Sequence, residues 1–283
     1  EGPRRPIVQD GDGRLVAVIG AGPAGMEAAV TLKQRGFDVV VFDKRDEIGG
    51  NLHVAKKPPF KGKFEWAIDY YKSMAKKLNI TMKLGKEVTA QEVLALKPHS
   101  ILVATGSNVI SIPLEGLDQV QTVQAHDVLA NDMQFANKKV VVIGGGITGL
   151  ETALYINRQG TNQVSVVDML PEWPVDMLDM RYQNEALLEV RHCNDQGVAL
   201  FYNNKVVKFA DGKLFIESTK DGEVKELPAD VIVLSVGVKP NDALWQELLA
   251  SGHPSVWKAG DAIATGKINK AVLHGSKFGY SLN

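Results

Sequence analysis

Near the middle of this 283-residue chain, three glycines stand at the spacing GxGxxG within the stretch KVVVIGGGITGLETALYINRQGTNQVSVVD. The apolar run VVVI before them predicts a strand that is buried on both faces. Gly144 permits a tight turn, Gly146 lets backbone approach a pyrophosphate, and Gly149 lets the following helix pack against the strand. Asp168 closes the next strand, 24 residues after Gly144. Together these features predict a dinucleotide-binding βαβ unit rather than a glycine turn of purely structural purpose.

The start of the chain carries a second pattern of the same kind. The run Leu15–Ile19 predicts a strand, and the sequence GAGPAG follows it directly. A helix is expected from about Ala24 to Arg35, and the next strand, Phe37–Phe42, closes on Asp43. Asp43 stands 23 residues after the first glycine of the turn. Two complete fingerprints in one chain predict two bound dinucleotides.

Strand and helix patterns alternate along most of the remaining chain, which is typical of an α/β fold with parallel sheets. An irregular loop is expected over Lys56–Lys63, because two prolines there forbid a helix. Asp-Gly turns at 211–212 and 221–222 predict an antiparallel meander. Further helices are expected over Lys63–Leu78, Ala90–Leu96, Arg181–Asn194 and Thr265–Tyr280, and further strands over Ile80–Leu84, Ser100–Ala104, Val198–Tyr202 and Asp230–Leu234.

Composition excludes several classes of function. The chain has 32 basic and 33 acidic residues, so its net charge of −1 gives no electrostatic case for nucleic acid or an anionic membrane. No apolar run approaches the ~18 residues of a membrane-spanning helix, and we expect a cytoplasmic protein. The single cysteine, Cys193, excludes a CxxC redox pair and is expected to be a structural thiol. The histidines lack metal-ligand spacing, so no metal site is expected.

Over nearly its whole length the chain resembles the flavoprotein oxidoreductases that bind two dinucleotides. It is most similar to the C-terminal half of the group that includes 2,4-dienoyl-CoA reductase, enoate reductase and trimethylamine dehydrogenase. The motifs that carry the resemblance are VIGAGPAGMEAA (Val18–Ala29), GGNL (Gly49–Leu52), ATG (Ala104–Gly106), GGGITGLETA (Gly144–Ala153), VGVKPN (Val236–Asn241) and AGD (Ala259–Asp261).

The resemblance implies two Rossmann-like domains, with the NAD(P)H-binding domain inserted into a split FAD-binding domain. Residues 1–14 are expected to be a linker, 15–110 and 240–283 the FAD domain, and 111–239 the NAD(P)H domain. The N-terminal turn of the last helix would then point at the flavin, and its positive end would stabilise the reduced anionic form.

The resemblance also implies the residues of both sites. FAD would be held by Gly20, Gly22, Pro23, Ala24, Gly25, Asp43, Gly50, Asn51, Leu52, Val88, Ala104, Thr105, Gly106, Gly260, Asp261 and Ala271. The nicotinamide cofactor would be held by Gly144, Gly146, Ile147, Thr148, Gly149, Asp168 and Gly237.

No catalytic side chain is expected, because hydride transfer between two cofactors depends on orientation and exclusion of water. Glu151 matches an acid near the flavin–nicotinamide contact of related reductases, but a charge favoured by the helix N-terminus explains it equally well.

Asp168 also favours NADH over NADPH, because a carboxylate would face the 2′-phosphate. The next residues, Met169 to Glu172, add a negative charge and no arginine.

Without a redox cysteine pair, electrons from NADH are expected to leave through another centre. In the group that the chain resembles, this module follows a barrel with FMN and an iron–sulfur cluster, and the linker-like start is where such a fusion would join. Two alternatives stay open. One is a stand-alone NADH oxidase or diaphorase subunit, and the other is a structural module that binds ADP without redox chemistry.

Overall fold

The chain folds into two compact units in a computed structural model, which describes residues 7–171 and 180–283. Unit 1 holds the residues up to Lys56 together with Lys63–Asn108 and Val238–Asn283. Unit 2 holds Lys57–Gly62 and Val109–Gly237. The short segment 57–62, which we call the strap, therefore packs with unit 2, although the expected boundaries had placed it in the first domain. Glu172 and residues 1–6, which entered the sequence analysis, lie outside the described residues.

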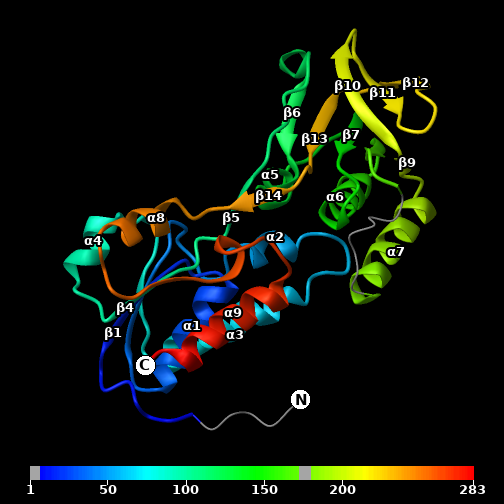
Figure 1. The fold of residues 1–283 in the computed structure, drawn as a ribbon. Helices are drawn as coiled ribbons and strands as arrows, with labels where there is room; N and C mark the ends of the chain where they lie inside the picture. Colours follow the sequence, from blue (N-terminus) through cyan, green and yellow to red (C-terminus); the bar gives the residue numbers. More distant parts are fainter. Residues whose placement is uncertain (1–6, 172–179) are drawn as a thin grey trace. The chain divides into compact units, whose positions relative to one another are not determined.

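Unit 1 is built on a five-stranded parallel sheet with the strand order β15-β4-β1-β2-β3. Its strands β1 and β4 are labelled in Figure 1. Successive residues of each strand point to opposite faces, so each face receives its own helices. One face packs against α1, α3 and α9, and the other packs against α4 and α8. The elements are β1 (Leu15–Ile19), α1 (Pro23–Gln34), β2 (Asp38–Phe42), α3 (Phe64–Lys77), β3 (Thr81–Lys83), α4 (Ala90–Ala95), β4 (Ser100–Val103), α8 (Ala243–Ala250), β15 (Val256–Lys258) and α9 (Ile268–Ser281).

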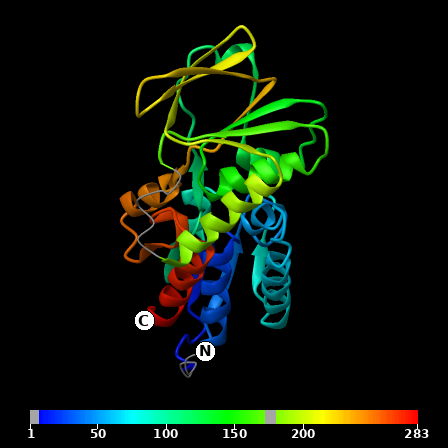
Figure 2. The ribbon, with the colours of Figure 1, turned by 90° about the vertical axis from the view of Figure 1, so that its right-hand side faces the viewer.

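Helices α1 and α9 of unit 1 lie side by side, blue and red in Figure 2. Their backbones meet closely: a Cβ atom on Gly275 would lie 2.1 Å from the carbonyl oxygen of Ala24. The buried Arg35, just after α1, donates to the carbonyl oxygens of Gly279 and Leu282 at 2.7 and 2.8 Å, and so satisfies the free end of α9. The first fingerprint helix is thus fixed along its length by the last helix of the chain.

Arg35 also holds the segment before β1. Its guanidinium group binds both carboxylate oxygens of Asp10, at 2.8 and 2.6 Å. The backbone N–H groups of Asp10 and Gly11 donate to the carbonyl oxygen of Arg35. Residues 1–14 were expected to be a linker, but from Asp10 onward the segment packs on unit 1, because this buried arginine needs an acidic partner.

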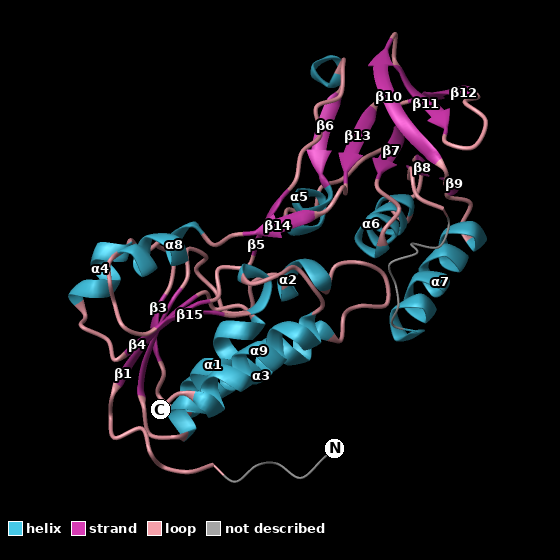
Figure 3. Cartoon of the chain, viewed as in Figure 1, coloured by secondary structure: helices cyan, strands magenta, loops and turns pink. Residues whose placement is uncertain are grey.

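Unit 2 repeats the plan with a five-stranded parallel sheet of order β6-β13-β7-β8-β9, drawn in magenta in Figure 3. One face packs against helices α5, α6 and α7, and the other packs against an antiparallel three-stranded sheet. The elements are β6 (Gln121–Gln124), α5 (Ala125–Ala130), β7 (Lys139–Ile143), α6 (Ile147–Asn157), β8 (Gln163–Val167), α7 (Met180–Asp195), β9 (Ala199–Phe201), β10 (Asn204–Ala210), β11 (Lys213–Ser218), β12 (Val224–Pro228) and β13 (Val231–Leu234).

The expected α/β fold class with two Rossmann-like sheets is confirmed. The last helix begins at Ile268 rather than at Thr265, and several short elements were not expected. These are α2 (Leu52–Ala55), β5 (Ser107–Val109), η1 (Leu117–Gln119), β14 (Val238–Pro240) and η2 (Gly260–Ala262), as well as β6, α5 and α8. Among the described residues, no helix has the length and apolar character needed to cross a membrane.

Candidate cofactor-binding sites

The candidate site of unit 1 lies where the strand order reverses, beyond the carboxyl ends of β1 and β4. β2 and β3 follow β1 on one side, while β4 and β15 lie on the other. In open parallel sheets a ligand crevice forms at this switch point. The first glycine of the turn, Gly20, has φ +113°, and a Cβ there would lie 2.2 Å from the carbonyl oxygen of Ala104. Only glycine fits, because the turn after β1 touches the backbone that follows β4.

The second glycine of the same turn faces open space. The protein atom nearest to a Cβ on Gly22 would be the Cα of Gly50, at 3.9 Å. Gly22 is the N-cap of α1 and has no side-chain capping bond, so the helix N-terminus keeps free backbone N–H donors. A free cradle at a positive helix end suits a pyrophosphate. The residues present therefore fit a dinucleotide here.

Asp43, which was expected to contact a ribose, also accepts hydrogen bonds from two backbone N–H groups. One carboxylate oxygen accepts from the backbone N–H of Ala21 at 2.7 Å, and the other accepts from that of Arg45 at 2.8 Å. The acid thus ties the glycine turn to the chain that follows β2. Each oxygen retains a lone pair for a ligand hydroxyl.

The other predicted FAD-binding residues differ in how exposed their side chains are. Asn51 is exposed, whereas the side chains of Leu52 and Val88 are buried in two different apolar clusters. Those two residues can therefore offer only backbone atoms to a ligand. Ala271 is buried beside Gly260. A Cβ atom on Gly260 would lie 3.6 Å from the Cβ atom of Ala271.

Asp261 is half-buried and held in place from two sides. Its carboxylate accepts from the Ser107 hydroxyl at 3.3 Å and from the backbone N–H of Gly266 at 3.1 Å. Burial raises the pKa of Asp261, and these two hydrogen bonds partly offset the effect. Neither Ser107 nor Gly266 was predicted, because a hydroxyl and a loop amide carry no motif of their own.

Unit 2 carries the same construction at the end of β7. Gly144 has φ +110°, and a Cβ there would lie 2.2 Å from the carbonyl oxygen of Ser235, beside the predicted Gly237. A Cβ on Gly146 would meet no protein atom within 4 Å. Gly146 is the N-cap of α6, without a side-chain capping bond, and the predicted Ile147 and Thr148 are the first two residues of that helix. This cradle also fits a pyrophosphate.

Asp168 copies the arrangement of Asp43. Its carboxylate accepts from the backbone N–H of Gly145 at 2.6 Å and from that of Leu170 at 2.8 Å. The side chain of Met169 is exposed beside it. The structure therefore brings Asp168 to the glycine turn, as a ribose-binding acid requires.

Glu151 does not lie in the first turn of α6, so the explanation by the helix N-terminus is wrong. Its carboxylate lies 2.9 Å from Nζ of Lys61, a strap residue that the sequence analysis did not single out. Burial raises the pKa of Glu151, and the hydrogen bond from Lys61 opposes that shift. A lysine in an irregular loop gives no periodic signal from which its partner could be predicted.

Cys193 is buried within unit 2. Burial, followed by the nearby Glu189, raises the pKa of its thiol to about 12. A thiol that stays protonated is a poor nucleophile and a poor redox group, so the structural role expected for Cys193 fits its surroundings.

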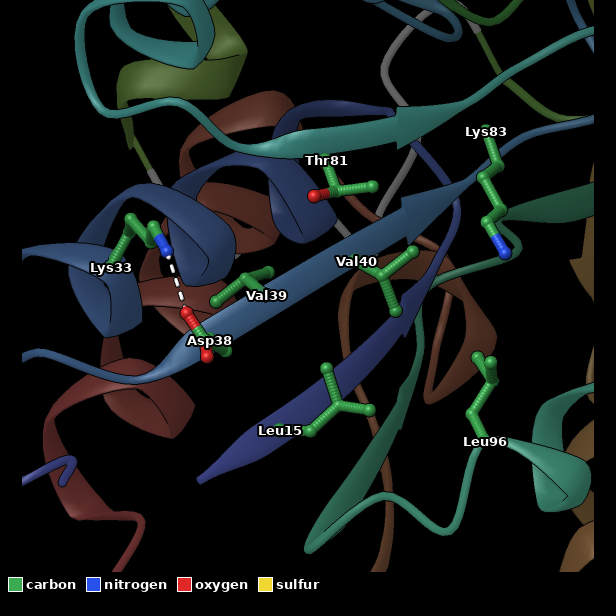
Figure 4. Close-up of a pocket in the computed structure, with 8 residues that line it drawn as sticks. All are labelled: Leu15, Lys33, Asp38, Val39, Val40, Thr81, Lys83 and Leu96. Carbon is green, nitrogen blue, oxygen red and sulfur yellow. Dashed lines mark hydrogen bonds and ion pairs between the residues drawn. The ribbon is translucent and has the colours of Figure 1, made fainter. Parts of the chain in front are cut away.

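A hollow of about 380 Å³ lies elsewhere in unit 1 (Figure 4). Its lining contains none of the predicted site residues, and two of its charged groups, Lys33 and Asp38, already pair with each other at 3.0 Å. The remaining lining residues are Leu15, Val39, Val40, Thr81, Lys83 and Leu96. The glycine turns, not this hollow, carry the chemistry of a cofactor site.

The chain is similar to known proteins in both sequence and fold. A family profile described as pyridine nucleotide-disulphide oxidoreductase matches residues 14–272. NADH oxidase of Thermoanaerobacter brockii is 31% identical over 277 residues, which cover 95% of this chain and 41% of that protein. Bilirubin reductase of Mediterraneibacter gnavus (strain CC55_001C) is 35% identical over 237 residues, which cover 84% of this chain and 36% of that protein.

A solved structure of 2-naphthoyl-CoA reductase in complex with 2-naphthoyl-CoA has the same fold. It matches 98% of this chain with a TM-score of 0.88 and 28% identity, and the match covers 41% of that protein. The chain thus spans about two fifths of the length of these larger proteins.

Proposed function

The chain belongs to the pyridine nucleotide-disulphide oxidoreductase family, a family of flavoprotein oxidoreductases, and from that premise we propose that it carries electrons from NADH to FAD. Unit 1 binds FAD, and unit 2 binds the nicotinamide nucleotide. The observation that carries this proposal is the pair of matching cradles, each with an unobstructed second glycine at a helix N-terminus and an acid bound to the glycine turn.

The chain's residues would hold the two nucleotides by their phosphates and riboses. The free N–H groups at the start of α1 and α6 face the pyrophosphates, and the partial positive charge of each helix end adds to the attraction. The free lone pairs of Asp43 and Asp168 accept hydrogen bonds from ribose hydroxyls.

NADH is the preferred donor in this proposal. The Asp168 carboxylate lies at the glycine turn, where it would repel a 2′-phosphate. The exposed side chains that follow, Met169 and Leu170, are apolar and bring no compensating positive charge.

The flavin, when bound, supplies the hydride-accepting chemistry. The protein then has to orient the cofactors and exclude water, and it needs no general acid or base for this step. Ala271, in the first turn of α9, lies at the positive end of a 14-residue helix that would favour negative charge on the reduced ring system.

Electrons then leave for a redox centre outside this chain. The only cysteine is buried with a raised pKa, so no dithiol can receive them here. The relatives are named for different substrates and yet share this region, so a common electron-entry step accounts for its similarity better than substrate recognition does. We propose that the acceptor is an FMN and iron–sulfur centre carried by another domain of a longer polypeptide.

An anaerobic visible spectrum of the purified chain, recorded with FAD before and after NADH, tests the proposal. A yellow protein that bleaches with NADH is the expected result. A chain that stays colourless after incubation with FAD and removal of the unbound flavin would contradict the proposal and favour a structural module that binds ADP. Rapid reoxidation of the bleached chain by air alone would favour a stand-alone NADH oxidase.

A further inference from the structure

The strap, residues 57–62, is held on unit 2 by charges and rings. Lys57 forms an ion pair with Asp132. The ring of Phe60 lies 5.1 Å from the ring of His192, and the guanidinium carbon of Arg158 lies 4.5 Å from the Phe60 ring centroid. On both sides of the strap the chain belongs to unit 1, where α2 ends and α3 begins.

Lys61 of the strap faces three carboxylates of unit 2. Its Nζ lies 2.9 Å from Glu151 on α6, and 2.8 and 3.8 Å from Glu185 and Glu189 on α7. We call these three residues the acid cluster. The exposed fraction of the side chain is 19% for Lys61, 13% for Glu151 and 6% for Glu189, so water screens these three charges poorly, whereas Glu185 is 33% exposed.

Lys61 thus bridges carboxylates on two packed helices, α6 and α7. Burial alone lowers the pKa of Lys61, but its hydrogen bonds to Glu151 and Glu185 outweigh burial and raise it, so Lys61 stays charged. His192 also faces the cluster, with Nδ1 3.6 Å from Glu189, and Cys193 lies near the same carboxylate. Without Lys61, the carboxylates would repel one another across the contact between α6 and α7.

Helix α6 is in direct backbone contact with the glycine turn that precedes it. A Cβ on Gly149 would lie 1.9 Å from the carbonyl oxygen of Gly144, so α6 sits directly on the glycine turn. Glu151 follows two residues later. A force that moves Glu151 therefore moves the N-terminus of α6, which is the cradle of the second candidate site.

We propose that Lys61 is a positioning residue for the nicotinamide nucleotide. By pairing with Glu151 on α6 and with Glu189 on α7, it holds the two helices together and so keeps the phosphate cradle of unit 2 in place. The inference rests on the proposed function of unit 2, because it concerns the same site.

Calorimetric titration of the full chain with NAD⁺ tests the role of Lys61. NAD⁺ is already oxidised and cannot donate a hydride, so the titration reports binding alone. Lys61→Met should weaken binding about tenfold at pH 8, equivalent to about 1.4 kcal/mol. The deficit should shrink as the pH is lowered from 8 to 6, because burial raises the pKa of Glu151 and the variant lacks the Lys61 hydrogen bond that opposes this rise, so proton uptake by Glu151 relieves the repulsion. Lys61→Arg should bind NAD⁺ with an affinity within about threefold of that of the unmodified chain, because arginine keeps the positive charge.

Lys57→Met is the matched control. It removes a lysine from the same strap, but its partner Asp132 is 53% exposed, so affinity should change less than about twofold at either pH. If Lys61→Met bound NAD⁺ as tightly as Lys57→Met at both pH values, the inference would be overturned. Glu151→Gln combined with Lys61→Met should recover part of the lost affinity, since one repelling charge is gone.

Unfolding midpoints of the same variants separate the two proposals. If the native chain bound no NAD⁺, the proposed function of unit 2 would fail, and the positioning role would fail with it. The unfolding midpoint of Lys61→Met should still fall as pH rises from 6 to 8, whereas that of Lys57→Met should not. Equal midpoints at every pH would overturn the counter-ion role alone.

Discussion

Asp43 and Asp168 serve the fold, and in the proposed function each would also bind a ligand. Each carboxylate accepts two backbone N–H groups, one from the glycine turn and one from the chain after the strand. Its spacing from the first glycine predicts the contact with a ribose, but not the anchoring of the turn. That second role depends on where two loops meet in space.

Replacing Asp168 removes both of these roles at once. Asp168→Ala should weaken NADH binding by about tenfold or more, because it removes the ribose contact and leaves two backbone donors unpaired. Discrimination against NADPH should relax at the same time. Dissociation constants for both nucleotides measure the effect, and Asp43→Ala is the matched control, which should weaken FAD retention and keep the NADH preference. If NADPH reduces the unmodified chain better than NADH, the assignment of Asp168 is wrong.

A substitution at Gly146 should affect nucleotide binding without affecting the stability of the fold. A Cβ atom there would meet no protein atom within 4 Å, and threonine caps helices about as well as glycine. Gly146→Thr should therefore change the free energy of unfolding by less than about 0.5 kcal/mol, and should still abolish NADH binding. Chemical denaturation and nucleotide titration measure the two effects, and Gly22→Thr should do the same to FAD alone. Normal NADH binding by Gly146→Thr would contradict the location of the cradle.

At the scale of elements, the packing of α1 on α9 supports the first site. The two helices approach closely at Gly275, beside the carbonyl group of Ala24, and Ala24 belongs to the first turn of α1. The sequence predicts both helices but not their contact, because small residues are common on helices and do not identify a partner.

Gly275→Ala should disturb this contact. The added methyl group would lie 2.1 Å from a backbone oxygen, so we expect a loss of about 1–3 kcal/mol in the free energy of unfolding. FAD retention should fall as well, because α1 carries the cradle. Leu273→Ala on the exposed side of α9 is the control and should change neither. A variant with normal stability and normal flavin content would contradict this account of the packing.

Short elements were harder to predict than the central strands. Strands such as β1 and β7 are continuous apolar runs because both of their faces are buried. The edge strand β6, with the sequence QTVQ, has no residue in the buried class and gives no such signal. The four-residue helix α2 is too short for periodicity to show.

At the scale of the whole molecule, the two units repeat one plan. β1, β2, β3 and β4 of unit 1 hold the places that β7, β8, β9 and β13 hold in unit 2. The two fingerprints predict this repeat, because each specifies a strand, a turn, a helix and a second strand. Neither fingerprint predicts the strap, which depends on long-range charge pairing and on no local pattern.

The strap has a consequence for any attempt to cut the molecule into parts. A fragment from Val109 to Gly237 would contain every strand and helix of unit 2, but it would leave Lys61 behind. Its three clustered glutamates would then lose their contacts with Lys61, and we expect thermal unfolding at pH 8 to begin at a lower temperature than in the full chain. Glu151→Gln with Glu185→Gln should restore part of the difference. In this chain, a continuous stretch of sequence and a self-sufficient folding unit are therefore two different things.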